Sequence, residues 1–183
     1  MSVITTDTTP RFNLKNQLFS PVEGTLGVAS IKSTLDKSQL YNALDGIASI
    51  PPTKGLNGRV SPLTKIKNYD DWPYKIVYAN KGIKGATIMR HINTFYNGQR
   101  NIPINRRPNI IHVAGNFAII RADLSEDEPT PEYFLSTEEP DLHAIVCALN
   151  GLQQRAMAST KILFLYGHLI ENVISAGKNS SSS

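Results

Sequence analysis

The sequence predicts an α+β domain in which helices flank a small antiparallel sheet, with an irregular N-terminal arm and a long apolar C-terminal helix or helical hairpin. Three observations predict this class. Of the 183 residues, 40% are hydrophobic, which is ordinary for a globular domain. Short runs of β-branched and aromatic residues in the middle of the chain are bounded by turn residues. Apolar residues then recur at helical spacing near the C-terminus.

The N-terminal part predicts an arm, a helix and a loop. Residues 1–30 are rich in Thr, Ser, Asn, Pro and Gly and show no sustained periodicity, so they predict the irregular arm. A single domain is expected to follow over 31–177. A helix is predicted from Ser33 to about Ser49, because Ser33 can cap it and apolar side chains repeat along one face: Leu40, Tyr41, Leu44 and Ile47. The prolines that follow end the helix, and 53–73 predicts a loop.

The central part alternates strand and helix patterns. The β-branched and aromatic residues over 74–79 predict a strand. Residues 88–97 predict a helix, because four side chains share one face and Asn97-Gly98 can stop it: Ile88, Ile92, Phe95 and Tyr96. Residues 110–113 and 117–122 predict a β-hairpin, since the Ala114-Gly115-Asn116 turn between them contains Gly and Asn.

The C-terminal stretch 138–176 predicts a long helix or, if Asn150-Gly151 divides it, a helical hairpin. Twenty of the 33 residues from 142 to 174 are apolar, so apolar side chains cover most of the circumference. One small sheet cannot cover all of them, which predicts at least a dimer. The residues expected in that interface are Leu152, Leu163, Tyr166 and Ile170. A disordered tail is expected over 178–183.

Charge is distributed unevenly along the chain. The formal net charge is +4, but residues 54–121 carry a net +10 and residues 123–141 a net −8. Because three prolines punctuate the acidic segment 123–141, it predicts an exposed linker. The asymmetry indicates a polyanionic partner or a contact between copies, unless the two blocks neutralise each other within the folded chain.

The basic segment favours nucleic-acid binding. Between Arg90 and Arg107, arginines alternate with aromatic and amide side chains, which can contact phosphates, stack on bases and bond base edges. The residues expected to bind nucleic acid are Lys81, Lys84, Arg90, Arg100, Arg106 and Arg107. RNA or single-stranded DNA is the expected partner, because the sequence contains no helix-turn-helix or zinc-finger pattern.

Candidate catalytic and metal sites are less specific. His143 and Cys147 would share a helix face, but the chain has no second cysteine to complete a zinc site, and the apolar run around Cys147 favours packing. Asp70, Asp71 and Asp123 could hold Mg²⁺, although the adjacent carboxylates Asp70 and Asp71 before Trp72-Pro73 are typical of a solvated turn. No catalytic residue, metal or cofactor is therefore predicted.

Together these patterns favour a non-enzymatic nucleic-acid-binding protein that forms homo-oligomers. The alternative is a self-assembling structural subunit of a particle, filament or nucleocapsid, held by complementary charge blocks and the apolar C-terminal helix. A small nuclease or transferase is a third possibility. A cytoplasmic protein without a membrane partner is expected, because no apolar stretch reaches the ~20 residues of a membrane span, no signal peptide is evident and the single cysteine fits a reducing compartment.

Overall fold

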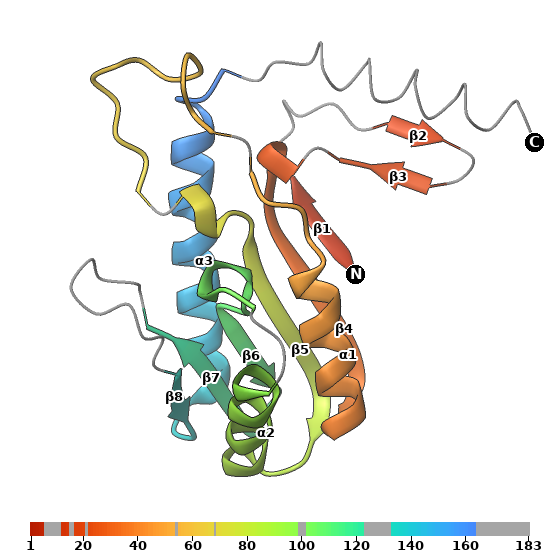
Figure 1. Cartoon of the computed structure of the whole chain (residues 1–183). Coiled ribbons are helices and arrows are strands. Elements are labelled where there is room, and N and C mark those ends of the chain that lie inside the picture. The colour runs from red at the N-terminus through yellow and green to blue at the C-terminus, as the bar shows by residue number, and fades with distance from the viewer. Residues whose placement is uncertain are drawn as a thin grey trace, which may run out of the picture.

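The computed structural model describes residues 1–5, 12–14, 17–20, 22–53, 55–67, 69–98, 102–122 and 133–163. In these ranges a six-stranded sheet carries three α-helices, and a separate short hairpin pairs β2 (Phe12–Leu14) with β3 (Gln17–Phe19) (Figure 1). The sheet strands are β1 (Ser2–Thr5), β4 (Thr25–Leu35), β5 (Tyr74–Gly82), β6 (Ile110–Val113), β7 (Phe117–Arg121) and β8 (Tyr133–Ser136). The helices are α1 (Lys37–Ala48), α2 (Gly85–Asn97) and α3 (Pro140–Ser159).

The sheet is mixed, so the prediction of a small antiparallel sheet is wrong. Its strand order is β1-β4-β5-β6-β7-β8, and three of the four inner strands, β4, β5 and β6, are parallel to one another. Helices α1 and α2 form the crossovers that parallel neighbours require, since two parallel strands cannot be joined by a tight turn. The other pairs, β1–β4, β6–β7 and β7–β8, are antiparallel.

The N-terminal residues belong to the sheet, which corrects the prediction of an irregular arm. β1 pairs with β4, and β4 pairs with β5 along most of its length, so the boundary predicted at residue 30 falls inside a strand. β4 also includes Ser33 to Leu35, whose pairing with β5 delays the start of the helix. Asp36 caps α1 in place of Ser33, because its Oδ1 accepts a hydrogen bond from the Gln39 N–H at 2.8 Å.

Other predicted elements are confirmed with small shifts of their ends. The strand predicted over 74–79 is β5, the helix predicted over 88–97 is α2, and the predicted hairpin consists of β6 and β7. Gly115 lies in the hairpin turn with φ +64°, a left-handed conformation that glycine adopts without strain. These elements follow local patterns, which explains why the sequence predicts them.

The long apolar helix predicted over 138–176 is not observed. α3 ends at Ser159, and the chain then bonds back to an earlier loop. The Leu163 N–H donates to the Arg59 carbonyl at 2.7 Å, and Arg59 Nε donates to the Leu163 carbonyl at 3.2 Å. Residues 164–183, including the predicted tail, lie outside the described residues, as do 123–132 of the predicted acidic linker. Within the described chain, no helix combines the length and hydropathy needed to cross a membrane.

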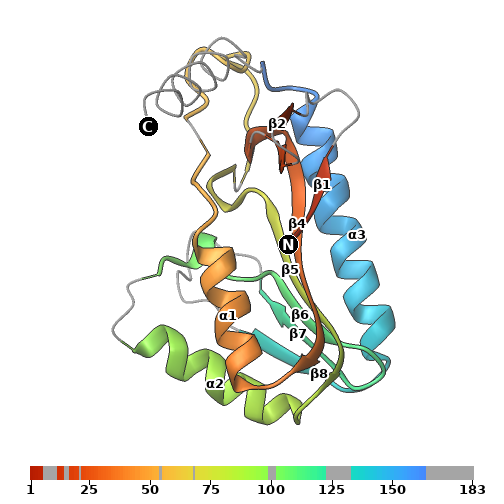
Figure 2. The ribbon, with the colours of Figure 1, turned by 90° about the vertical axis from the view of Figure 1, so that its right-hand side faces the viewer.

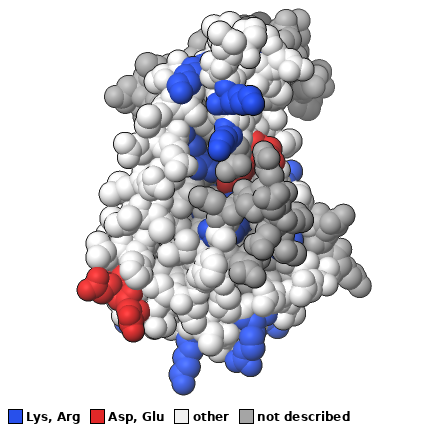
Figure 3. Space-filling view, turned by 90° about the vertical axis from the view of Figure 1, so that its left-hand side faces the viewer, with Lys and Arg blue, Asp and Glu red and all other residues white. Residues whose placement is uncertain are grey.

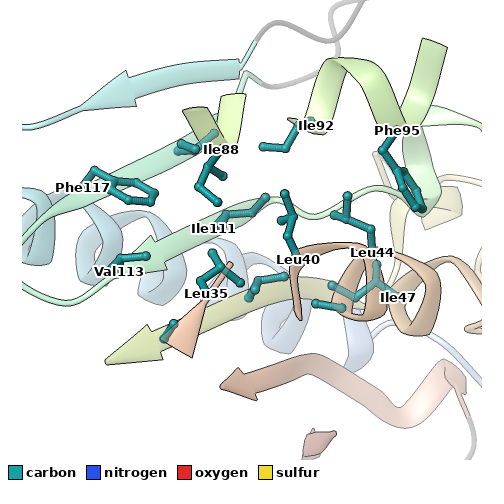
Figure 4. Close-up of a cluster of buried hydrophobic side chains, with 14 of the residues drawn as sticks. Leu35, Leu40, Leu44, Ile47, Ile88, Ile92, Phe95, Ile111, Val113 and Phe117 are labelled. Carbon is teal, nitrogen blue, oxygen red and sulfur yellow. The ribbon is translucent and has the colours of Figure 1, made fainter. Parts of the chain in front are cut away.

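The helices cover opposite faces of the sheet. α1 and α2 lie on one face and α3 lies on the other, so the chain forms three layers (Figure 2). The largest apolar core fills the space between the sheet and the α1/α2 pair (Figure 4). Fully buried side chains there include Leu44 of α1, Ile92 of α2 and Ile111 of β6. A smaller apolar cluster joins α3 to the opposite face through Ala144, Ile110 and Ala118.

Candidate functional site: a charged cluster and pocket beside helix α3

A buried carboxylate lies where β5 begins and β7 ends. Asp71 closes a short 3₁₀ turn (Tyr69–Asp71) and is only 4% exposed. Its oxygens pair with three cationic side chains: Arg121 Nη2 at 2.6 Å, Arg155 Nη2 at 3.0 Å and Lys75 Nζ at 3.3 Å. Asn109 Nδ2 donates a further hydrogen bond at 3.0 Å. One carboxylate therefore joins β5, β7, α3 and the segment before β6.

The cluster carries more positive than negative charge. Burial by itself would raise the pKa of Asp71, but the charges of Lys75 and Arg121 and the hydrogen bonds from Arg121 and Asn109 outweigh it and hold this pKa below its usual range. Burial lowers the pKa of Lys75 to about 8, and repulsion from Arg121 and Arg155 acts in the same direction against the attraction of Asp71. A carboxylate shared by three cations leaves the site short of negative charge.

Arg155 connects this cluster to α3. Its guanidinium lies 4.8 Å from the centre of the Tyr74 ring and also donates to the Asp71 carbonyl at 3.2 Å. The side chain is buried, and its Nε has no hydrogen-bond partner among the described residues. A buried donor without an acceptor costs stability, so the packing of Arg155 is not optimised for stability alone.

A pocket of about 680 Å³ opens over the cluster. Asp71, Arg121 and Arg155 form its charged part, and Trp72, Tyr74, Ile66 and Ile120 supply aromatic and aliphatic surface. Three further cations lining the pocket are exposed: Lys65, Lys67 and Lys161. On the face that α3 helps to form, Lys and Arg side chains gather in the upper half around a small acidic area (Figure 3). Further acidic side chains lie at the lower left, and other Lys and Arg side chains project at the lower edge. This charge and shape suit an anionic ligand with an apolar part.

No metal site is evident in the part of the chain that the structure describes. No group of three or more His, Cys, Asp or Glu side chains there lies close enough together to hold a metal ion. His143 Nδ1 lies 2.6 Å from Ser136 Oγ, and His112 Nε2 lies 2.6 Å from Asp141 Oδ1. These contacts join α3 to β8 and to β6, which is a structural role for both histidines.

The residues predicted to bind nucleic acid do not form one surface. Lys81, Lys84 and Arg90 are exposed near the start of α2, whereas Arg106 donates to the Ala48 and Ile50 carbonyls at the end of α1. The Arg107 guanidinium lies 4.1 Å from the centre of the Tyr96 ring and donates to the Ile102 carbonyl. Arg100 lies outside the described residues.

The residues predicted to form an interface also separate. Leu152 is half-buried and packs toward Gly27 of β4, whereas Leu163 is 60% exposed. Tyr166 and Ile170 lie outside the described residues. Four exposed apolar side chains of α3 lie near its start, at Leu142, Ile145, Val146 and Leu149, and a fifth, Met157, lies near its end.

Sequence reasoning missed the charged cluster. Asp71 was expected in a solvated turn beside Asp70, yet Asp71 is buried while Asp70 is exposed. Its partners Arg121 and Arg155 lie 50 and 84 residues further along the chain. The one local indication is the four-residue spacing from Asp71 to Lys75, which does not by itself predict burial.

Comparisons with solved structures identify the fold. The chain is similar to NucC of P. aeruginosa ATCC27853 in its cAAA-bound form, with 15% identity and a TM-score of 0.58 over 91% of this chain and 68% of that one. For cAAA-bound NucC of E. coli MS115-1 the identity is 13% and the TM-score 0.57, over 90% of this chain and 66% of that one. For the apo form of the E. coli MS115-1 NucC the identity is 12% and the TM-score 0.51, over 79% of this chain and 64% of that one. No family model and no curated protein matches the sequence.

At these identities the likeness establishes a shared fold, and this chain spans about two thirds of the length of each NucC chain. NucC is a nuclease effector activated by a cyclic oligonucleotide. The comparison therefore overturns the prediction of a non-enzymatic nucleic-acid-binding protein and its alternative, a self-assembling structural subunit.

Proposed function

We propose that this chain is a nuclease-type enzyme that acts on the phosphodiester backbone of nucleic acid, and that the pocket beside α3 binds the backbone phosphate. The observation that carries the proposal is the excess of cations around Asp71 in a pocket of this fold. Cations fixed in a partly dehydrated site stabilise the charge that develops on a phosphate during its hydrolysis. The three pocket lysines are the donors best placed for that role, because they line the pocket and are exposed.

Many nucleases use divalent metal ions held by carboxylates. Among the described residues that line the pocket, Asp71 is the one acidic side chain, and its oxygens are already occupied by Arg121, Arg155, Lys75 and Asn109. The described residues therefore do not fit a metal at this site. The roles assigned here are limited to binding the phosphate and stabilising its charge.

Cleavage and binding assays test this proposal. Labelled DNA and RNA are incubated with the protein, with and without Mg²⁺ and with and without cAAA, the ligand bound to NucC in the comparison structures. Replacing Lys65, Lys67 and Lys161 by Ala should abolish cleavage. It should also flatten the slope of the logarithm of the binding constant against the logarithm of salt concentration, by about 0.7 for each lost phosphate contact on a single strand. The matched control replaces Lys81 and Lys84, exposed cations remote from the pocket, and should change neither.

The outcomes separate cleanly. A wild-type protein that leaves every substrate intact under all four conditions would contradict the nuclease assignment. Cleavage that survives the pocket substitutions but fails in the Lys81/Lys84 control would move the phosphate site to α2.

We also propose that the protein forms a homo-oligomer through α3. Four apolar side chains on α3 share one exposed face and are each more than half exposed: Leu142, Ile145, Val146 and Leu149. An exposed patch of this kind is typical of an interaction surface. Leu149→Glu should lower the molar mass measured by light scattering, and a wild-type protein that is monomeric at micromolar concentration would contradict the proposal.

A further inference from the structure

One face of α3 lines the pocket with two kinds of polar chemistry. Arg155 of α3 and Lys161, two residues beyond the end of α3, supply cations, while Asn150 and Gln154 of α3 supply carboxamides one helical turn apart. Gly151 lies on the same face and lets the Tyr74 ring pack closely against the helix. Positive charge alone would serve any phosphate, so the two carboxamides indicate a ligand with a second polar group.

The two carboxamides already interact with each other. Gln154 Nε2 donates to Asn150 Oδ1 at 3.5 Å. Asn150 keeps its Nδ2 donors and Gln154 keeps its Oε1 acceptor for other partners. A donor beside an acceptor is the pattern that Asn and Gln present to the edge of a nucleobase.

The spacing along α3 suits a nucleotide. Asn150 precedes Arg155 by five residues, which corresponds to about 7.5 Å along the helix axis. A base edge and a phosphate of the same nucleotide can therefore reach the two groups at once. Tyr74, Ile66 and Met157 line the pocket with surface for the flat, weakly polar ring and the sugar. The volume of about 680 Å³ lies within the range of small-molecule sites, roughly 300–1,000 Å³.

We infer that the pocket recognises a nucleotide rather than a bare phosphate, with the base edge on Asn150 and Gln154 and the phosphate on Arg155 and the pocket lysines. This inference rests on the proposed function in one respect, namely that the pocket binds phosphate. The ligand class is a nucleoside phosphate, either free or as one unit of an oligonucleotide.

Calorimetry with small probes tests the inference on the full chain. The probes are the four ribonucleoside 5′-monophosphates, ribose 5-phosphate and inorganic phosphate, and a dinucleotide distinguishes a free nucleotide from a unit of a strand. At least one nucleotide should bind ten-fold or more tightly than ribose 5-phosphate. Asn150→Ala with Gln154→Ala should remove that difference while leaving the affinity for ribose 5-phosphate unchanged. Both side chains are exposed on a helix, where alanine is well tolerated.

Gln153→Ala is the matched control, because Gln153 is an exposed neighbour on α3 that does not line the pocket. It should leave every affinity at the wild-type value. Lys161→Ala should weaken nucleotide and ribose 5-phosphate alike.

Two results would overturn the inference. One is a wild-type protein that binds nucleotides no more tightly than ribose 5-phosphate, and the other is a double variant that keeps the preference. If nucleic-acid cleavage depends on the pocket lysines in either case, the proposed function stands and base recognition alone is wrong. If no phosphate probe binds and the lysine substitutions leave cleavage unchanged, the pocket is not the phosphate site.

Discussion

The apolar core under α1 and α2 and the charged cluster around Asp71 are built from the same strands. On β5, Val77 belongs to the core and Lys75 to the cluster, and on β7 the same is true of Ile119 and Arg121. Each pair is two residues apart, so both members point to the same face of the sheet. The core ends where α1 ends, and charged residues fill the end of the sheet beyond it.

The difference concerns what each region contributes to folding. Apolar burial stabilises the folded state directly, by about 25 cal/mol for each Å² removed from water. A buried group of ions loses hydration energy, and its mutual attraction roughly offsets that loss when the geometry is good. Apolar side chains would therefore stabilise this end of the sheet more than the cluster around Asp71 does. Its retention beside a pocket is consistent with a ligand that uses the excess positive charge.

The largest expected effect comes from removing the one negative charge of the cluster. Asp71→Asn keeps the shape of the side chain but leaves Lys75, Arg121 and Arg155 without their counter-charge. The free energy of unfolding, measured by chemical denaturation, should fall by about 3–5 kcal/mol. The neighbouring Asp70→Asn is the control, and because Asp70 is exposed its effect should stay within about 0.5 kcal/mol. Equal effects at the two positions would show that burial of the charge is unimportant.

A core substitution should be nearly as destabilising but should not affect ligand binding. Leu44→Ala removes a fully buried side chain from the α1 face and should cost about 2–5 kcal/mol, the range for leucine in a packed core. Calorimetry below the melting transition should show unchanged phosphate binding by the folded variant. Loss of binding would mean that the two regions are coupled.

The two regions should also differ in their response to pH. The pKa of Lys75 is lowered to about 8, so above pH 8 the folded state loses a proton that the unfolded state keeps up to its ordinary pKa of about 10.5. Unfolding then takes up a proton, and the contribution of Lys75 to stability rises with pH across this window, by up to about 1.4 kcal/mol per pH unit. The wild-type protein should gain stability between pH 8 and 10.5 relative to Lys75→Met. A constant or falling difference would contradict a depressed pKa.

The smallest expected effects come from adding one methyl group at a glycine on each face, which compares how closely the helices pack on the sheet. A Cβ at Gly151 of α3 would overlap the Tyr74 ring, whereas a Cβ at Gly46 of α1 would come no closer than 3.5 Å to the end of Met1. Gly151→Ala should therefore destabilise by about 1–3 kcal/mol through overpacking. Gly46→Ala should stabilise by about 0.5–1 kcal/mol, because alanine favours the helix. Thermal denaturation of both variants gives the comparison, and a stabilised Gly151→Ala variant would show that α3 can move away from the sheet.

Local patterns identified much of the secondary structure but not the sheet. The helical spacing in α2 and the turn residues between β6 and β7 specify those elements within a few residues of sequence. β4 was missed because Gly27, Ala29 and Ser30 give it little apolar alternation, and its burial comes from strands and helices on both sides. Without β4, the crossover that makes the sheet mixed could not be predicted.

The sequence by itself determined the class of element at most positions, the positive charge of the central segment and the apolar character of α3, because these depend on residues close together in the chain. Only the tertiary structure decided which charges meet. Asp71, Asn109, Arg121 and Arg155 are up to 84 residues apart, and the strand order and the packing of α3 on Tyr74 bring them together. The same arrangement buries Asp71 and leaves the adjacent Asp70 exposed, since burial depends on the surrounding layers rather than on the residue type.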